Sequence, residues 1–267
     1  MRSASFALFA LSILIAAPAE ATPGAAIKAA VANPARLDSD KPRDKYRHPA
    51  ETLGFFGIQP SQTVIEYSPG GGWYTRILMP LLVHGHYIAV VGNTPRAIEG
   101  ARKLIAPLPG GARADVNGFD IAAATMAKPN SVDRVLTFRN IHNLLMPEDG
   151  GAKDGSVARA FFRAAFKALK PGGMLGVVDH RLPEKADVTR EQTSGYVKRS
   201  TVIRLATEAG FKLAGESEIN ANPKDTADWP NGVWTLPPTL SQKDQSRAKY
   251  LAIGESDRMT LRFIKPR

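Results

Sequence analysis

The sequence predicts an α/β protein with a doubly wound, mostly parallel sheet of seven strands. Short runs of β-branched and aromatic residues alternate with helical segments along most of the chain, which is the pattern of strands joined by crossover helices. Three consecutive glycines join the first strand to the helix after it, and such turns let backbone approach a ligand. The 267 residues, 43% of them hydrophobic, suit one domain with a sizeable core.

Residues 1–21 have the pattern of a secretory signal peptide. Arg2 gives a positive start, residues 6–17 form an apolar run too short to span a bilayer, and residues 19–21 are a small-x-small cleavage pattern. A hydrophobic helix that stays on the protein is the alternative. We therefore expect a periplasmic or secreted protein with no membrane span in its mature part. The lack of cysteine is compatible with an oxidising compartment.

The segment after the signal peptide differs from the rest of the chain. Residues 22–45 are rich in Ala, Pro, Lys and Asp, and we expect an N-terminal arm with a short helix at 25–32. The main domain is expected over residues 46–267. It begins with a helix at 50–56, which is predicted from helical spacing of apolar residues and ends at Gly57.

Seven strands are predicted from short runs rich in β-branched and aromatic residues that are bounded by turn residues. No crossover helix is evident before residue 241 in the long stretch between the last two strands, which we interpret as a functional loop. The strands cover residues 64–67, 87–91, 112–116, 132–138, 174–179, 211–219 and 259–264.

Local start and stop signals define the connecting helices. Asn93 or Thr94 caps the second of them, and Pro95 stands in its first turn. Ser200 caps the fourth, and Pro80 bends or ends the first. The helices cover residues 73–82, 95–106, 156–169, 200–209 and 241–250.

Charge and motif content exclude several classes of function. The net charge is +10, but the charges are scattered, so a basic surface is favoured over a nucleic-acid groove. The Gly-x-Ser-x-Gly elbow of hydrolases and the phosphate loop are absent. Of the five histidines only His84 and His86 are close in sequence, and they flank a turn glycine, so no metal site is predicted.

Polar residues gather after the predicted strands, where ligands bind in open α/β sheets. Each also has a structural explanation, such as a turn cap or an ion pair. Together they favour a functional edge of the sheet. The residues are the glycine turn Gly70, Gly71 and Gly72, then Asn93, then Arg139, Asn140 and His142, and finally Asp179 and His180.

Three ordered motifs carry a family resemblance. Glu66-x-Ser68-x-Gly70-x-Gly72 resembles the first motif of class I S-adenosylmethionine-dependent methyltransferases, Glu/Asp-x-Gly-x-Gly-x-Gly. Residues 132–142 resemble the strand-four motif, and 168–175 resemble the Leu-Lys-Pro-Gly-Gly motif before strand five. The chain is also similar to exported, predicted methyltransferases of bacteria. The resemblance implies a Rossmann-like class I methyltransferase fold with an antiparallel last strand.

The resemblance also implies how the cofactor, S-adenosylmethionine, is held. The three glycines approach its methionine part, and Glu66 orients the turn or holds its amino group. Ser68 replaces the first glycine of the family's motif. Val91 stands where an acidic residue grips the ribose, which leaves Asn93 to bind one hydroxyl. Either Asp115 or Asn117 is expected to face the adenine.

Methyl transfer is an in-line displacement that is served mainly by positioning. His142 or His180, with Asp179 beside them, has a suitable intrinsic pKa if the acceptor must lose a proton. Tyr46, Tyr74 and Tyr196, together with Arg139, are expected to line the acceptor site, with simple packing as the alternative for each tyrosine. A non-catalytic binding protein on the same fold is the alternative function. A nicotinamide-dependent oxidoreductase is a third reading, because Gly70, Gly72 and Thr75 partly match that fingerprint.

Overall fold

The structure is a computed structural model, and it describes residues 24–267. The signal peptide predicted over residues 1–21 lies outside the described residues. Within residues 24–267, none of the helices has both the length and the apolar character needed to cross a membrane.

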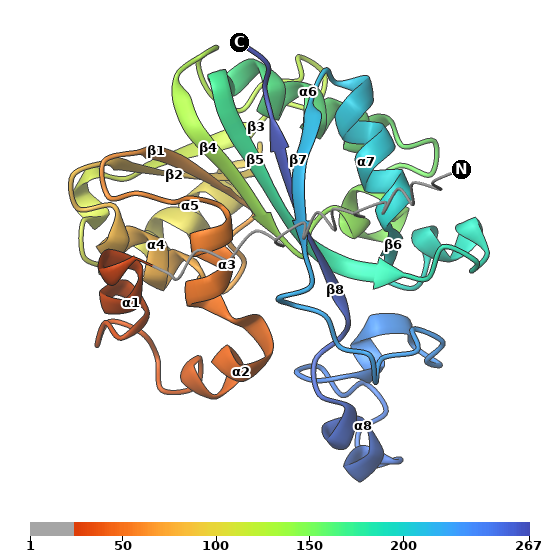
Figure 1. Ribbon diagram of the computed structural model, residues 1–267. Coiled ribbons are helices and arrows are strands. Elements are labelled where there is room, and N and C mark those ends of the chain that lie inside the picture. Colours follow the sequence, from red (N-terminus) through yellow and green to blue (C-terminus); the bar gives the residue numbers. More distant parts are fainter. Residues whose placement is uncertain (1–23) are drawn as a thin grey trace, which may run out of the picture.

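The core is a single twisted sheet in which seven strands follow the order β3-β2-β1-β4-β5-β8-β7 (Figure 1). The first five strands of this order run parallel, and β8 is antiparallel to both of its neighbours. A short extra strand, β6 at Val197–Lys198, pairs with the end of β5. The predicted fold class is therefore confirmed. The strands are β1 Thr63–Tyr67, β2 His86–Gly92, β3 Asp115–Phe119, β4 Val132–Phe138, β5 Leu169–Leu182, β7 Lys212–Ser217 and β8 Arg258–Ile264.

Helices cover both faces of the sheet because alternate residues of each strand point to opposite sides. On one face Val64 and Leu136 pack with apolar residues of α1 (Ala25–Val31), α3 (Pro49–Phe55), α4 (Thr75–Leu81) and α5 (Pro95–Ile105). On the other face Ile65 and Val135 pack with α6 (Ser156–Ala168) and α7 (Arg199–Glu208). These helices begin and end within two residues of their predicted bounds.

The third strand differs from its prediction. It begins at Asp115 instead of residue 112, because residues 111–113 form a further 3-10 turn after Gly110, whose φ is 84°. Asp115 consequently pairs with Ile88 at the amino end of the strand.

The predicted turn at residues 171–173 is instead a bulge within β5. Leu169 pairs with Val132 and Met174 pairs with Arg134, so four residues of β5 stand opposite one residue of β4. Gly172, with a φ of 79°, supplies the left-handed conformation that this bulge needs.

The segment that begins the described chain and the segment between β7 and β8 both pack at the carboxyl edge of the sheet. The segment predicted as an arm packs onto the domain, where Ile27 and Ala30 are buried and Asp40 O accepts a hydrogen bond from Trp73 Nε1 at 3.1 Å. It continues into α2, Asp44–Arg47. The segment between β7 and β8 contains α8 at Arg247–Ile253, which lies below the sheet in Figure 1. The helix predicted at 241–250 is therefore displaced, because Ser246 takes a left-handed conformation (φ 54°) immediately before it.

Candidate functional site

The turn after β1 has three residues in left-handed conformations. Ser68, Gly70 and Gly72 have φ angles of 51°, 57° and 78°, which favour glycine because a Cβ is crowded there. Ser68 adopts this conformation while its N–H donates to Val90 O at 2.7 Å, which ties the turn to β2. Gly71 does not have a positive φ, and a Cβ placed on it meets nothing within 4 Å. The backbone of the turn therefore borders open space.

Glu66 is buried at the end of β1, behind the turn. Its Oε2 accepts hydrogen bonds from Tyr87 OH at 2.6 Å and from Thr75 Oγ1 at 2.7 Å. Burial raises the pKa of Glu66 to about 7, although these hydrogen bonds and the charge of Arg76 oppose the shift. The carboxyl group therefore connects the turn to α4 and β2 and keeps its proton in weakly acidic solution.

The raised pKa of Glu66 predicts a pH-dependent stability. The folded state keeps the proton up to about pH 7, whereas the unfolded chain releases it near the ordinary value of 4.5. The free energy of unfolding therefore falls as the pH rises from 4.5 to 7, with a contribution of about 3 kcal/mol from this group. In Glu66→Gln the amide oxygen can accept both hydrogen bonds and no longer titrates. Urea unfolding followed by circular dichroism measures the free energy of unfolding of both proteins. Between pH 5 and pH 8 the difference should shift in favour of the variant by up to about 3 kcal/mol.

Glu99→Gln is the matched control, because Glu99 is exposed on α5. Its stability should stay parallel to that of the wild type over the whole pH range. A Glu66→Gln curve that also stayed parallel would contradict the buried, protonated carboxyl group.

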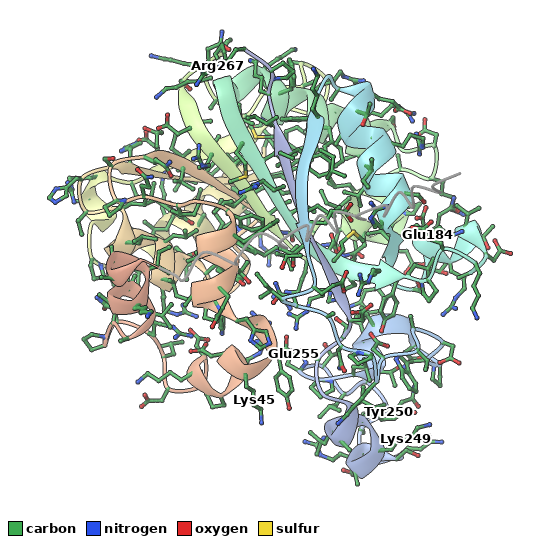
Figure 2. All side chains as sticks on the ribbon, in the orientation of Figure 1. Lys45, Glu184, Lys249, Tyr250, Glu255 and Arg267 are labelled. Carbon is green, nitrogen blue, oxygen red and sulfur yellow. The ribbon has the colours of Figure 1, made fainter. Side chains whose placement is uncertain are left out.

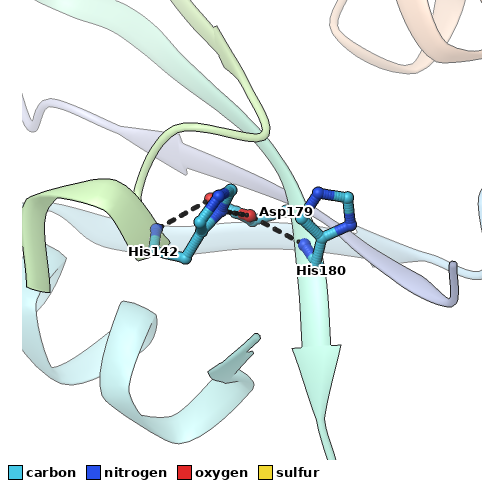
Figure 3. Close-up of side chains that lie close together, drawn as sticks. All are labelled: His142, Asp179 and His180. Atoms are coloured by element: carbon cyan, nitrogen blue, oxygen red, sulfur yellow. Dashed lines mark hydrogen bonds and ion pairs between the residues drawn. The ribbon is translucent and has the colours of Figure 1, made fainter. Parts of the chain in front are cut away.

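Asp179 organises the ends of β4 and β5. It is fully buried, and its Oδ2 accepts hydrogen bonds from Ile141 N at 2.6 Å and His142 N at 3.3 Å. Its Oδ1 accepts from His180 N at 2.7 Å and lies 2.7 Å from His142 Nδ1 (Figure 3). An ionised carboxylate only accepts hydrogen bonds, so His142 donates from Nδ1 and keeps its Nε2 lone pair. The predicted grouping of His142, Asp179 and His180 is thus present as a hydrogen-bonded cluster.

His180 is held from its other side. Its Nδ1 lies 2.5 Å from Ser256 Oγ, next to β8, and its ring meets that of His142 at a centroid distance of 5.0 Å. Burial, together with the positive charges of Arg139 and Arg258, lowers the pKa of His180 well below its ordinary value. His180 is therefore neutral at physiological pH.

The cluster also places potential metal-ligand atoms of His142, Asp179 and His180 within 4.8 Å of one another. Local histidine spacing did not indicate these three residues as possible metal ligands, since 37 residues separate His142 from Asp179. Both Asp179 oxygens already accept hydrogen bonds, and the nearby charge of Arg139 opposes a cation. These contacts favour an acid–base pair over a metal centre, and the absence of a metal site stays a prediction.

The glycine turn and the two histidines of the cluster line one cavity of about 460 Å³ at the carboxyl edge of the sheet. The N-terminal segment contributes Asp40, Arg43 and Arg47 to its wall, and the segment before β8 contributes Trp234 and Glu255. A second cavity of about 440 Å³ adjoins it across residues 68–70 and runs along α5. The site can therefore hold an elongated ligand that crosses the glycine turn.

Comparison with protein-family models found no match, and comparison of the sequence with curated proteins found none. Solved structures do match. One is a SAM-dependent methyltransferase from Aquifex aeolicus, with a TM-score of 0.55 and 16% identity over 84% of this chain and 92% of that one. Another is CrArsM, an arsenic(III) S-adenosylmethionine methyltransferase from Chlamydomonas reinhardtii, with 0.53 and 17% over 92% and 74%. The [4+2]-cyclase SpnF matches with 0.52 and 14% over 81% of both chains.

The chain has the class I methyltransferase fold. Its glycine turn, β4 end and β5 end occupy neighbouring positions at the carboxyl edge of this fold. The neighbours share under a fifth of their residues with the chain, so the likeness extends to the fold and leaves the chemistry to the site itself.

Three other predicted site residues lie at the cavity. Asn140 lines it, and its Nδ2 donates to Tyr67 O at 3.1 Å and to Ser68 O at 3.3 Å, so it joins the β4 end to the glycine turn. Tyr74 lines it too, with its ring stacked on Phe138 at a centroid distance of 3.6 Å. Arg139 follows β4 in a left-handed conformation with a φ of 63° and also lines the cavity.

Three predicted residues lie elsewhere. Tyr46 lines a separate cavity of about 220 Å³ beside α2. Tyr196 is buried behind the ring of His180, and its OH donates to Asp225 Oδ2 at 3.0 Å. Asp115, at the amino end of β3, pairs with His86 at 2.8 Å on the surface. Asp115 therefore lies at the amino edge of the sheet, away from the cavity at the carboxyl edge, because its strand begins three residues later than predicted.

The end of β2, where the ribose was expected, also differs in detail from the prediction. β2 ends at Gly92 instead of Val91, and neither residue supplies a carboxylate. Asn93 is exposed at this end and lies against Gly118 of β3. Asp120, an acidic residue directly after β3, was not among the predicted residues, and its Oδ1 accepts a hydrogen bond from Ala123 N at 2.9 Å.

Sequence reasoning also missed an arginine-rich wall. Glu255 binds three arginines at once, with distances of 2.7 Å to Arg43 Nε, 3.1 Å to Arg47 Nε and 3.1 Å to Arg258 Nη1. Burial alone would raise the pKa of Glu255, but these three charges outweigh it and lower the pKa to about 2. Glu255 lies between α2 and the segment that leads into β8 (Figure 2). Because 208 residues separate it from Arg47, no local pattern indicates this contact.

Proposed function

We propose that the protein is an exported S-adenosylmethionine-dependent methyltransferase. The observation that carries this proposal is a single cavity in which the glycine turn faces the His142–Asp179 pair, in a chain with the class I methyltransferase fold. Structural neighbours named as S-adenosylmethionine methyltransferases support the choice of cofactor. Export rests on the signal pattern of residues 1–21.

The residues at the turn fit this cofactor. The open space beside Gly71 accommodates a ligand directly against backbone. The Glu66 carboxyl group lines the cavity, and a nearby ammonium group would favour its ionised form, so it suits the amino group of a methionine part. The adjoining cavity along α5 accommodates the nucleoside part, with Asn93 beside it for one ribose hydroxyl. When bound, S-adenosylmethionine supplies a methyl group on a sulfonium, whose carbon–sulfur bond breaks with the electron pair staying on sulfur as the acceptor atom takes the methyl.

The His142–Asp179 pair supplies the proton chemistry. Asp179 fixes the tautomer in which Nε2 of His142 is a base, and this Nε2 takes the proton that the acceptor atom loses. Asp179 then stabilises the imidazolium that forms. His180 stays neutral and adds no positive charge to a site that must accept a sulfonium.

Calorimetric titration with S-adenosylmethionine tests the proposal. We expect saturable binding with one site per chain. No heat at near-millimolar cofactor, from protein whose circular dichroism shows an intact fold, would reject it. Export is tested by N-terminal sequencing of protein recovered from the periplasm, which should begin at residue 22; retention of Met1 would contradict it.

A non-catalytic binding protein on the same fold is the second candidate. It is favoured by the missing carboxylate at the end of β2, which weakens the grip on a ribose. SpnF shares this fold, and its structure is named as that of a [4+2]-cyclase instead of a methyltransferase. This candidate predicts that His142→Ala changes ligand affinity and that methyl-labelled cofactor never loses its label in the presence of the protein.

A further inference from the structure

The wall of the cavity opposite the glycine turn carries buried positive charge without matching acceptors. Arg47 is 1% exposed, and its Nη1 and Nη2 have no hydrogen-bond partner among residues 24–267. Arg43 Nη2 is buried without a partner in the same range. The Arg139 side chain also makes no hydrogen bond or ion pair with any described residue, although it lines the cavity. Buried charged donors are costly unless an acceptor satisfies them.

The acidic groups around the cavity do not meet this need. Glu255 is shared by Arg43, Arg47 and Arg258, so one carboxylate faces three guanidinium groups. Asp40 is bound by Arg76 Nε at 2.7 Å. Glu66 accepts hydrogen bonds from Thr75 and Tyr87, and Asp149 lies on the exposed rim. The wall therefore has more cations than anions.

These guanidinium groups lie on the histidine side of the cavity. The charges of Arg139, Arg258 and Arg47 act on His180 and lower its pKa, and Arg47 and Arg139 act on Tyr74 as well. Arg47 is fixed in place, because its Cζ lies 4.7 Å from the centroid of the Trp73 ring and its Nε binds Glu255. Its two Nη groups, pre-oriented in this way, present the planar fork that binds carboxylate and phosphate.

We propose that Arg43, Arg47 and Arg139, the arginine cluster, form a binding site for an oxyanion of the methyl acceptor, so that the acceptor is a small molecule bearing a phosphate or a carboxylate. The identification of the ligand as the methyl acceptor rests on the proposed function. The oxyanion site itself is inferred from the cavity and its unpartnered donors. The carboxylate of the cofactor's methionine part has the same chemistry, so the experiment must separate the two sources.

Inorganic phosphate is the probe, with calorimetry at constant ionic strength as the measurement. We expect the wild-type protein to bind phosphate at one site. Arg139→Gln should weaken phosphate binding at least tenfold. The melting temperature should not fall, because no described residue loses a hydrogen bond or ion pair when the Arg139 side chain is removed. Arg47→Lys keeps a charge near Glu255 but loses the Nη fork, and should weaken phosphate binding as well. Arg134→Gln is the control. Arg134 is a partly buried arginine of β4, and it lies near Gly57 at the end of this strand opposite to Arg139.

Repeating the phosphate titration with saturating S-adenosylmethionine separates the two sources. Simultaneous binding of both, with cofactor affinity unchanged in Arg139→Gln, supports an oxyanion site for the acceptor. Competition between phosphate and the cofactor, with both weakened in Arg139→Gln, assigns the cluster to the cofactor's carboxylate and overturns the proposal. Equal phosphate binding in wild type and Arg139→Gln, or none in the wild type, also overturns it. Phosphate binding in a protein that fails to bind the cofactor rejects the methyltransferase function while leaving the oxyanion site in place.

Discussion

Gly71→Val should reduce the affinity for S-adenosylmethionine by at least about a hundredfold and leave the fold intact. Gly71 lines the cavity, and a Cβ placed on it meets nothing within 4 Å, so the added isopropyl group has to project into the space that the ligand needs. Its backbone does not have a positive φ, and replacing glycine at such a position changes the free energy of unfolding by only about 1 kcal/mol. Calorimetry with the cofactor and thermal unfolding of the same sample measure the two effects separately.

Gly72→Ala is the contrasting variant, because its effect should appear first in stability. Gly72 has a φ of 78°, and a Cβ there would lie 2.9 Å from Leu104 Cδ1 of α5. A left-handed alanine costs about 1–2 kcal/mol and forced packing costs about 1–3 kcal/mol more.

If Gly71→Val bound the cofactor as tightly as the wild type, the ligand could not lie against the glycine turn.

His142→Ala should lower turnover by a factor of about 10²–10⁴ and change cofactor affinity less than threefold. The variant removes the Nε2 base, while Asp179 keeps its three hydrogen bonds from backbone N–H groups. Turnover is measured as S-adenosylhomocysteine formed in the presence of a periplasmic small-molecule extract. His84→Ala is the control, because His84 is an exposed turn residue between α4 and β2. Equal turnover in His142→Ala and the wild type would remove His142 from the chemistry.

Asp179→Asn separates positioning from folding. Asparagine retains an oxygen but turns its NH₂ group toward N–H donors, so at least one buried donor loses its acceptor, at a cost of about 1–3 kcal/mol. It also removes the charge that fixes the tautomer of His142. We therefore expect lower stability together with a turnover no higher than that of His142→Ala, both measured on the same preparation.

Local sequence signals predicted those features of the fold that depend on neighbouring residues. Thr94 caps α5 as predicted, with Ala97 N donating to its Oγ1 at 3.2 Å, because a cap involves residues three positions apart. The doubly wound, mostly parallel sheet followed from the alternation of strands and helices, and its antiparallel last strand followed from the family resemblance of the three ordered motifs. The start of β3 did not follow, since residues 111–113 add a turn that no capping residue indicates. That shift places Asp115 at the amino edge of the sheet instead of the carboxyl edge.

The candidate site was predictable on the side built by strand ends, and not on the side built by the N-terminal segment and the segment between β7 and β8. His142, Asp179 and Asn140 follow strands in sequence, so their meeting at one edge of the sheet could be expected. Arg47 and Glu255 lie on segments without regular pattern, and their ion pair depends on how residues 24–47 and 218–257 pack together. The arginine cluster therefore emerges only in three dimensions.

A crystal structure with bound S-adenosylhomocysteine tests the central claim most directly. We expect its amino-acid part to lie against residues 70–72, with its amino group at Glu66. Its sulfur should face the His142 side of the cavity, and its nucleoside should extend toward Asn93. The arginine cluster should remain free to bind an added phosphate. A product molecule bound away from the glycine turn, or a cavity that stays empty of product at saturating concentration, would contradict the proposed methyltransferase site.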